Sequence, residues 1–185
     1  HNFKALKQIS MSKIQVYFVP GLAASIEIFE NIKLPEATFE THFLEWILPK
    51  HNETIENYAK RMCEKIKHED IVLIGVSFGG IMVQEMSKIV KTKKTIIISS
   101  VKSSQELPIH MKLAKATKFY KVLPTSLLSK VNYLSSYVKG RGLIAKRVQL
   151  YNKYLFMKQT KYLDWAIENV LQWQRSIPDE KVIHI

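Results

Sequence analysis

Short apolar runs alternate with stretches of helical spacing over the first hundred residues. Ile14–Val19 and Ile71–Val76 are nearly uninterrupted apolar runs of strand length, and Thr95–Val101 is a third, rich in isoleucine. His42–Trp46 is a shorter strand candidate, closed by Pro49. Such continuously apolar strands are typical of a sheet with both faces covered.

Segments of helical spacing separate these strands. Phe78–Val90 is predicted to be a helix, and Ile26–Ile32 a short one. A third helix follows Asn52, a predicted N-cap, with apolar positions at Ile55, Tyr58, Ala59, Met62 and Ile66. Strands that alternate with helices predict an α/β fold, with a mainly parallel sheet and helices on both faces.

The pattern changes after Lys102. Residues 104–176 contain several helical stretches, broken by prolines and glycines, and no convincing strand. Lys181–Ile185 then resumes as a strand. We therefore expect a core of residues 11–103 and 177–185, a helical cap of residues 104–176 inserted before the last strand, and an N-terminal extension of residues 1–10.

The motif Gly75-Val76-Ser77-Phe78-Gly79 joins the strand Ile71–Val76 directly to the following helix. A strand that passes straight into a helix must turn sharply, and glycines on both sides of Ser77 permit the close backbone approach that the turn needs. The hydroxyl of Ser77 would project from the carboxyl edge of the sheet. The helix N-terminus behind it favours developing negative charge. We predict that Ser77 is a nucleophile.

This glycine-rich turn has two other possible interpretations. Ser77 could serve only as the N-cap of the helix. A phosphate-binding loop fits less well, because the Gly-Lys-Ser/Thr ending is missing and Gly75, Gly79 and Gly80 do not match dinucleotide spacing.

Val19-Pro20-Gly21-Leu22-Ala23 ends the first strand, and together with the Ser77 motif it resembles the α/β-hydrolase superfamily over residues 14–103. The resemblance implies that the backbone N–H groups of Leu22 and Phe78 form an oxyanion hole, in which one donor is typically worth about 3 kcal/mol. The superfamily more often has His-Gly in place of Pro20-Gly21, a difference that leaves the backbone donor intact. A plain Pro-Gly turn is the simpler alternative.

A serine nucleophile needs a base, and the base needs an acid to orient it. In this superfamily the acid follows the strand that corresponds to Lys181–Ile185, and the histidine follows one strand later. We therefore expect the triad acid and histidine beyond Ile185, and without them Ser77 would be weakly active at most. The histidines at 42, 51, 68, 110 and 184 do not fit the base, and neither Glu45 nor Asp179 fits the acid.

Charge is concentrated in the predicted cap. The formal net charge of the chain is +12, and residues 102–161 hold 13 lysines and arginines but one acidic residue, Glu106, so this segment accounts for the excess. A solvated basic face is the simplest explanation. An anionic ligand or a membrane surface could also bind there. No nucleic-acid-binding motif is present, so no nucleic acid is expected as a partner.

The remaining residues imply neither a cofactor nor a metal. Cys63 is predicted to be a buried structural thiol, and no cluster has metal-ligand spacing. No apolar run approaches the roughly 18 residues of a membrane-spanning helix. Ile14–Ala24 imitates a short signal sequence, but its polar and turn residues favour a strand, and we expect a cytoplasmic protein.

These observations predict a serine hydrolase, similar to an esterase, lipase or thioesterase. It would cleave an ester or related acyl bond of a small molecule through an acyl-enzyme intermediate. Ser77 in place of an aspartate argues against dehalogenase or epoxide-hydrolase chemistry. The alternative is a non-catalytic protein of the same fold, which would bind an anionic ligand or membrane through its basic cap.

Overall fold

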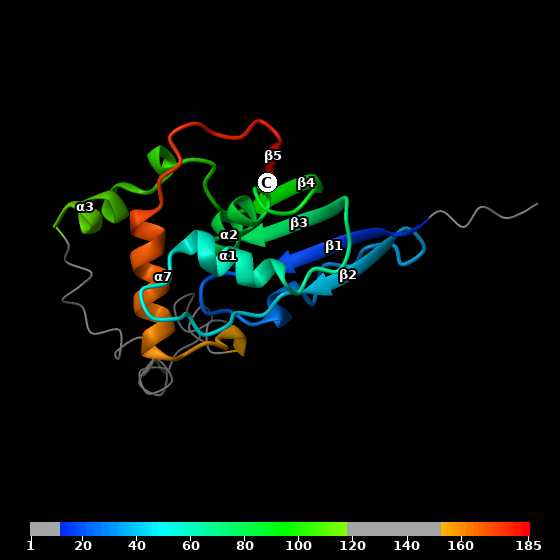
Figure 1. Ribbon diagram of the computed structural model, residues 1–185, viewed down its shortest axis with the longest axis horizontal. Coiled ribbons are helices and arrows are strands. Elements are labelled where there is room, and N and C mark those ends of the chain that lie inside the picture. Colours follow the sequence, from blue (N-terminus) through cyan, green and yellow to red (C-terminus); the bar gives the residue numbers. More distant parts are fainter. Residues whose placement is uncertain (1–11, 118–152) are drawn as a thin grey trace, which may run out of the picture.

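The computed structural model describes residues 12–117 and 153–185. These residues form one five-stranded parallel sheet with the strand order β2-β1-β3-β4-β5. The strands are β1 (Ile14–Val19), β2 (Phe39–Phe43), β3 (Ile71–Val76), β4 (Thr92–Ile98) and β5 (Val182–His184). The parallel sheet of the sequence prediction is confirmed, and its strands lie side by side in Figure 1.

The helices cover the two faces of the sheet unequally. They are the 3-10 helices η1 (Ile26–Phe29) and η2 (Ser104–Glu106) and the α-helices α1 (Ile55–Cys63), α2 (Phe78–Met86), α3 (Ile109–Thr117) and α7 (Thr160–Gln172). On one face α1, α2 and α7 bury their apolar sides against Tyr17, Leu73 and Ile97. On the other face Phe29 of η1 packs on Val16 and Phe18. Both faces therefore carry helical elements.

All nine residues of helix α2 are buried, so this helix lies in the interior of the molecule. Helix α7 lies across the carboxyl ends of the strands, toward which the arrowheads of β1, β2 and β3 point in Figure 1. It contributes Tyr162, Trp165 and Ala166 to the same apolar cluster as α1 and α2. Among the described residues, no helix is both long and apolar enough to cross a bilayer.

Several element boundaries differ from the sequence prediction. The second strand begins at Phe39 and ends at Phe43, so it does not extend to Trp46. Asn52 is not the N-cap of α1, because Thr54 takes that position and its side chain accepts a hydrogen bond from the Asn57 N–H. Asn52 instead occupies a left-handed turn, with φ 51°. The predicted extension of residues 1–10 and cap residues 118–152 lie outside the described residues.

Candidate functional site

The backbone at Ser77 makes the sharp turn that the sequence predicts. Ser77 lies between the last residue of β3 and the first residue of α2, with φ 51° and ψ −117°, a conformation that residues with a Cβ rarely adopt. Its side chain is exposed to solvent. Although Ser77 occupies the N-cap position, its hydroxyl makes no capping hydrogen bond, which argues against the interpretation of Ser77 as a simple helix cap.

Two glycines allow the backbone segments around Ser77 to pack this closely. A Cβ on Gly75 would lie 2.1 Å from the Gly79 carbonyl oxygen, and a Cβ on Gly79 would lie 2.3 Å from the Pro20 carbonyl oxygen. Both distances are far below van der Waals contact, so any side chain at either position would force the backbone apart. The first turn of α2 therefore rests directly on the end of β1.

Neighbouring strand ends fix the position of the Ser77 backbone. Its N–H donates to the Ile98 carbonyl (2.9 Å), and its carbonyl accepts a hydrogen bond from the Ser100 hydroxyl (2.7 Å). Ala23 and Ser99, which follow β1 and β4, also have positive φ values of 58° and 47°. Three of the five described non-glycine residues with positive φ thus lie beyond the carboxyl ends of neighbouring strands, and strained backbone of this kind is frequent at functional sites.

The predicted oxyanion turn lies beside Ser77. A Cβ built on Gly21 would stand 3.8 Å from the Ser77 Cβ, so the turn after β1 faces the serine. Phe78 is the first residue of α2, where a backbone N–H has no acceptor within the helix. Within the described part of the chain, neither the Leu22 N–H nor the Phe78 N–H donates to a protein acceptor. The predicted oxyanion hole needs two such amides without a partner in the protein.

No described histidine forms a hydrogen bond with Ser77. His68 lies before β3, at the opposite end of that strand from Ser77, and its Nδ1 lies 2.7 Å from the Tyr17 hydroxyl. His42 pairs with Gln15 and stacks on Tyr17, and its pKa is lowered, first by burial and then by the neighbouring His68. His184 lies in β5, as predicted. The His110 side chain lies outside what the structure describes.

The other sequence-predicted residues are placed as follows. Cys63 is a buried free thiol, and burial raises its pKa to about 11, in keeping with a structural role. In the described ranges, no group of three His, Cys, Asp or Glu side chains could hold a metal ion. Glu45 is exposed, and Asp179 pairs with Arg175 at the entrance to β5.

Sequence reasoning missed two aromatic residues that hold the turn after β1. The indole N–H of Trp46 donates to the Gly21 carbonyl (2.8 Å), and the Tyr162 hydroxyl accepts from the Ala23 N–H (3.4 Å). Both side chains are buried, and burial raises the pKa of Tyr162 well above its ordinary value. The local sequence predicts Trp46 only as the end of a strand and indicates no contact for Tyr162, because the partners of both side chains are distant in the chain.

The chain matches no protein-family model and no curated protein. It is similar to solved structures, among them a hydrolase from Pseudomonas aeruginosa, with 12% identity, a TM-score of 0.55, and coverage of 88% of this chain and 65% of that chain. A carboxylesterase from Nitrososphaera gargenis aligns with 15% identity and a TM-score of 0.58 over 86% of this chain and 64% of that chain.

The strand order, the turn at Ser77 and these structural matches agree. The chain has the α/β-hydrolase fold. It spans about two thirds of the length of the hydrolases it matches. The bottromycin epimerase BotH matches equally well, with 16% identity, a TM-score of 0.55, and coverage of 94% of this chain and 72% of that chain. The α/β-hydrolase fold alone therefore does not decide the reaction.

Proposed function

We propose that the chain provides the nucleophile and the oxyanion hole of a serine hydrolase that cleaves an ester or related acyl bond. The observation that carries the proposal is the exposed hydroxyl of Ser77, held on an unfavourable turn between β3 and α2. Next to it, the amides of Leu22 and Phe78 have no acceptor among the residues that the structure describes. This combination matches the geometry that acyl transfer requires: a nucleophile beside two main-chain donors.

The proposed reaction has two halves. The Ser77 oxygen attacks the carbonyl carbon of the substrate while its proton passes to a base, and the carbonyl electron pair moves onto the oxygen held by the Leu22 and Phe78 amides. Collapse of this intermediate breaks the ester bond, and the leaving alcohol takes the proton from the base. Water then attacks the acyl-enzyme in the same way and releases the acid. The base and its acid are not identified among the described residues.

Hydrolysis of p-nitrophenyl esters by the intact protein tests this function. We expect Ser77→Ala to lower kcat by at least about a thousandfold, because the variant lacks the oxygen that attacks the ester. Ser87→Ala is the matched control, since Ser87 lies at the other end of α2 and its hydroxyl donates to the nearby Gln84 carbonyl. Equal activity in Ser77→Ala and the wild-type protein would refute the proposal.

A non-catalytic binding protein is the second candidate. One observation favours it: α3 exposes Ile109 and Leu113 at 76% and 59% of their surface, next to the exposed Lys112. Apolar and basic side chains that share one exposed helix suit an anionic membrane. Co-sedimentation with phosphatidylserine vesicles, but not with phosphatidylcholine vesicles, in a protein without esterase activity would support this candidate over the hydrolase.

A further inference from the structure

The peptide unit that joins Gly21 to Leu22 is fixed through its carbonyl. The Gly21 oxygen accepts two hydrogen bonds, from the Trp46 indole N–H (2.8 Å) and from the Ala24 N–H (3.0 Å). None of the described peptide bonds is cis, so the Gly21 carbonyl and the Leu22 N–H point in opposite directions across one rigid plane. A donor that holds the carbonyl on the buried side therefore directs the Leu22 N–H away from the core.

Trp46 also contacts the second oxyanion residue. Its indole stacks on the Phe78 ring, with 5.2 Å between the ring centroids and an angle of 19° between the planes. Only 3% of Trp46 is exposed, so the hydrogen bond to Gly21 is shielded from competing water. One side chain thus connects the turn after β1 with the first residue of α2.

Tyr162 supports the same turn from helix α7. Its hydroxyl accepts from the Ala23 N–H (3.4 Å), and its ring packs 5.7 Å from the Trp46 ring. Ala23 has a φ of 58°, which costs free energy in a residue with a Cβ, so the turn needs outside contacts to persist. Residues 156 and 157 add two more, because their N–H groups donate to the Ala23 carbonyl.

We propose that Trp46 is a positioning residue of the oxyanion hole, and that Tyr162 assists it. Trp46 holds the Leu22 N–H in the direction of the Ser77 site without touching the substrate itself. This inference rests on the proposed hydrolase function. With Trp46 in this role, the rate of ester cleavage depends more than substrate binding does on an indole N–H that lies behind the site.

The chain offers a closely matched control in Trp165. Its indole N–H also donates to a backbone carbonyl, that of Glu53 (2.7 Å), and its ring also packs against Phe78, with centroids 6.1 Å apart. Trp165 does not bond to the turn at Gly21. Trp46→Phe and Trp165→Phe therefore remove the same chemical group from the same core, and they differ in whether the oxyanion turn loses its donor.

Ester hydrolysis by these two variants is the kinetic test. We expect Trp46→Phe to lower kcat by about tenfold or more with KM within about twofold, because a misaligned donor weakens transition-state binding first. Trp165→Phe should stay within about twofold of wild type in both parameters, and Tyr162→Phe should lower kcat by a smaller factor than Trp46→Phe. An equal loss in Trp46→Phe and Trp165→Phe would reduce the role of Trp46 to packing and overturn the inference.

A second measurement does not depend on catalysis. In protein labelled with 15N-leucine, the Leu22 amide resonance should shift in Trp46→Phe and stay unchanged in Trp165→Phe. An unmoved Leu22 resonance in folded Trp46→Phe overturns the role of Trp46, whatever the activity. Absence of esterase activity in the wild-type protein, with a moved resonance, instead overturns the hydrolase function on which the kinetic test depends.

Discussion

Ser77 combines an exposed hydroxyl with a backbone that glycine would adopt more easily. Its φ of 51° and ψ of −117° place it with Ala23 and Ser99 among the residues with positive φ at the strand ends. Conformations of this kind cost on the order of 1–3 kcal/mol in residues with a Cβ. The surrounding hydrogen bonds, from the Ser77 N–H to Ile98 and from the Ser100 hydroxyl to Ser77, hold the serine there.

This strain predicts a trade-off between stability and function. We expect Ser77→Gly to be more stable to urea than Ser77→Ala by about 1 kcal/mol, because glycine relieves the positive φ while both variants lack the nucleophile. Unfolding followed by tryptophan fluorescence measures the difference. A Ser77→Gly variant no more stable than Ser77→Ala would show that the turn is not strained.

The burial of Cys63 predicts a low reactivity of its thiol. Burial raises its pKa to about 11, so the reactive thiolate is scarce at pH 8. We expect iodoacetamide to alkylate the native protein at least about a hundredfold more slowly than the urea-unfolded protein. Mass spectrometry over time gives both rates, and comparable rates would contradict the burial of Cys63.

Sequence reasoning succeeds at residues whose chemistry is local. The glycines beside Ser77 mark the turn, and the strand before it and the helix after it are visible in the hydrophobic pattern. The contacts of Trp46 and Tyr162 could not be predicted in this way, because their hydrogen-bond partners Gly21 and Ala23 are 25 and 139 positions away in the chain. The strained backbone of Ala23 was equally invisible, since alanine gives no preference for positive φ.

At the level of elements, buried strands were predicted well and exposed boundaries poorly. The bounds of β1 and β3 match the prediction, because both are continuous apolar runs. Strand β4 begins at Thr92, earlier than predicted, because Lys93 and Lys94 are exposed on it and hide it from a hydrophobic pattern. Strand β2 is in register with β1 from Ile14↔Phe39 to Phe18↔Phe43, and the chain then leaves the sheet toward Trp46.

Separate substitutions of the two candidate N-cap residues test where α1 begins. Thr54 accepts from the Asn57 N–H, so Thr54→Ala should lower the free energy of unfolding by about 1 kcal/mol. Asn52 has a φ of 51° and no capping role, so Asn52→Gly should cost nothing or stabilise slightly. Urea unfolding of both variants provides the comparison, and a larger loss in Asn52→Gly would reverse the assignment.

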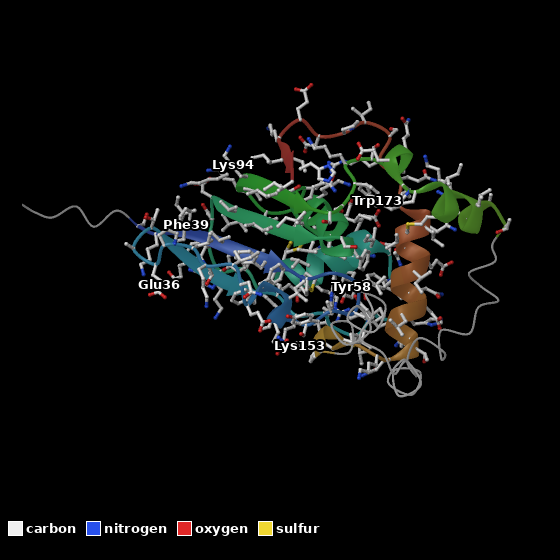
Figure 2. The ribbon with its side chains drawn as sticks, turned by 180° about the vertical axis from the view of Figure 1, so that it is seen from behind. Glu36, Phe39, Tyr58, Lys94, Lys153 and Trp173 are labelled. Atoms are coloured by element: carbon white, nitrogen blue, oxygen red, sulfur yellow. The ribbon has the colours of Figure 1, made fainter. Side chains whose placement is uncertain are left out.

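Across the whole molecule, helix α7 and the segment after it are bound to the core by polar contacts of buried groups. Trp173 donates to the carboxylate of Glu85, and Arg175 donates to the side chain of Gln84, so both residues connect the segment beyond α7 to the last turn of α2. In Figure 2 Tyr58 and Trp173 lie between the sheet and α7, whereas Glu36, Phe39 and Lys94 lie toward the other end of the sheet. The sequence pattern predicts several helical stretches within residues 104–176 but carries no information on this docking.

The docking of α7 predicts an order of stabilities. Trp173→Phe should cost about 2 kcal/mol, because it removes a hydrogen bond from the Glu85 carboxylate, whose side chain is 2% exposed and pairs with Lys88. Trp165→Phe removes a bond to a neutral carbonyl and should cost about 1 kcal/mol. Chemical unfolding ranks the two, and a greater loss in Trp165→Phe would contradict the buried charge contact.

The central claim is that Ser77 is an activated nucleophile facing two main-chain donors. The most direct measurement is covalent labelling of the intact protein with a fluorophosphonate, with the modified peptide located by mass spectrometry. The account predicts one label per chain, on Ser77, and none in Ser77→Ala. A folded wild-type protein that takes up no label, or takes it up at another residue, would contradict the account.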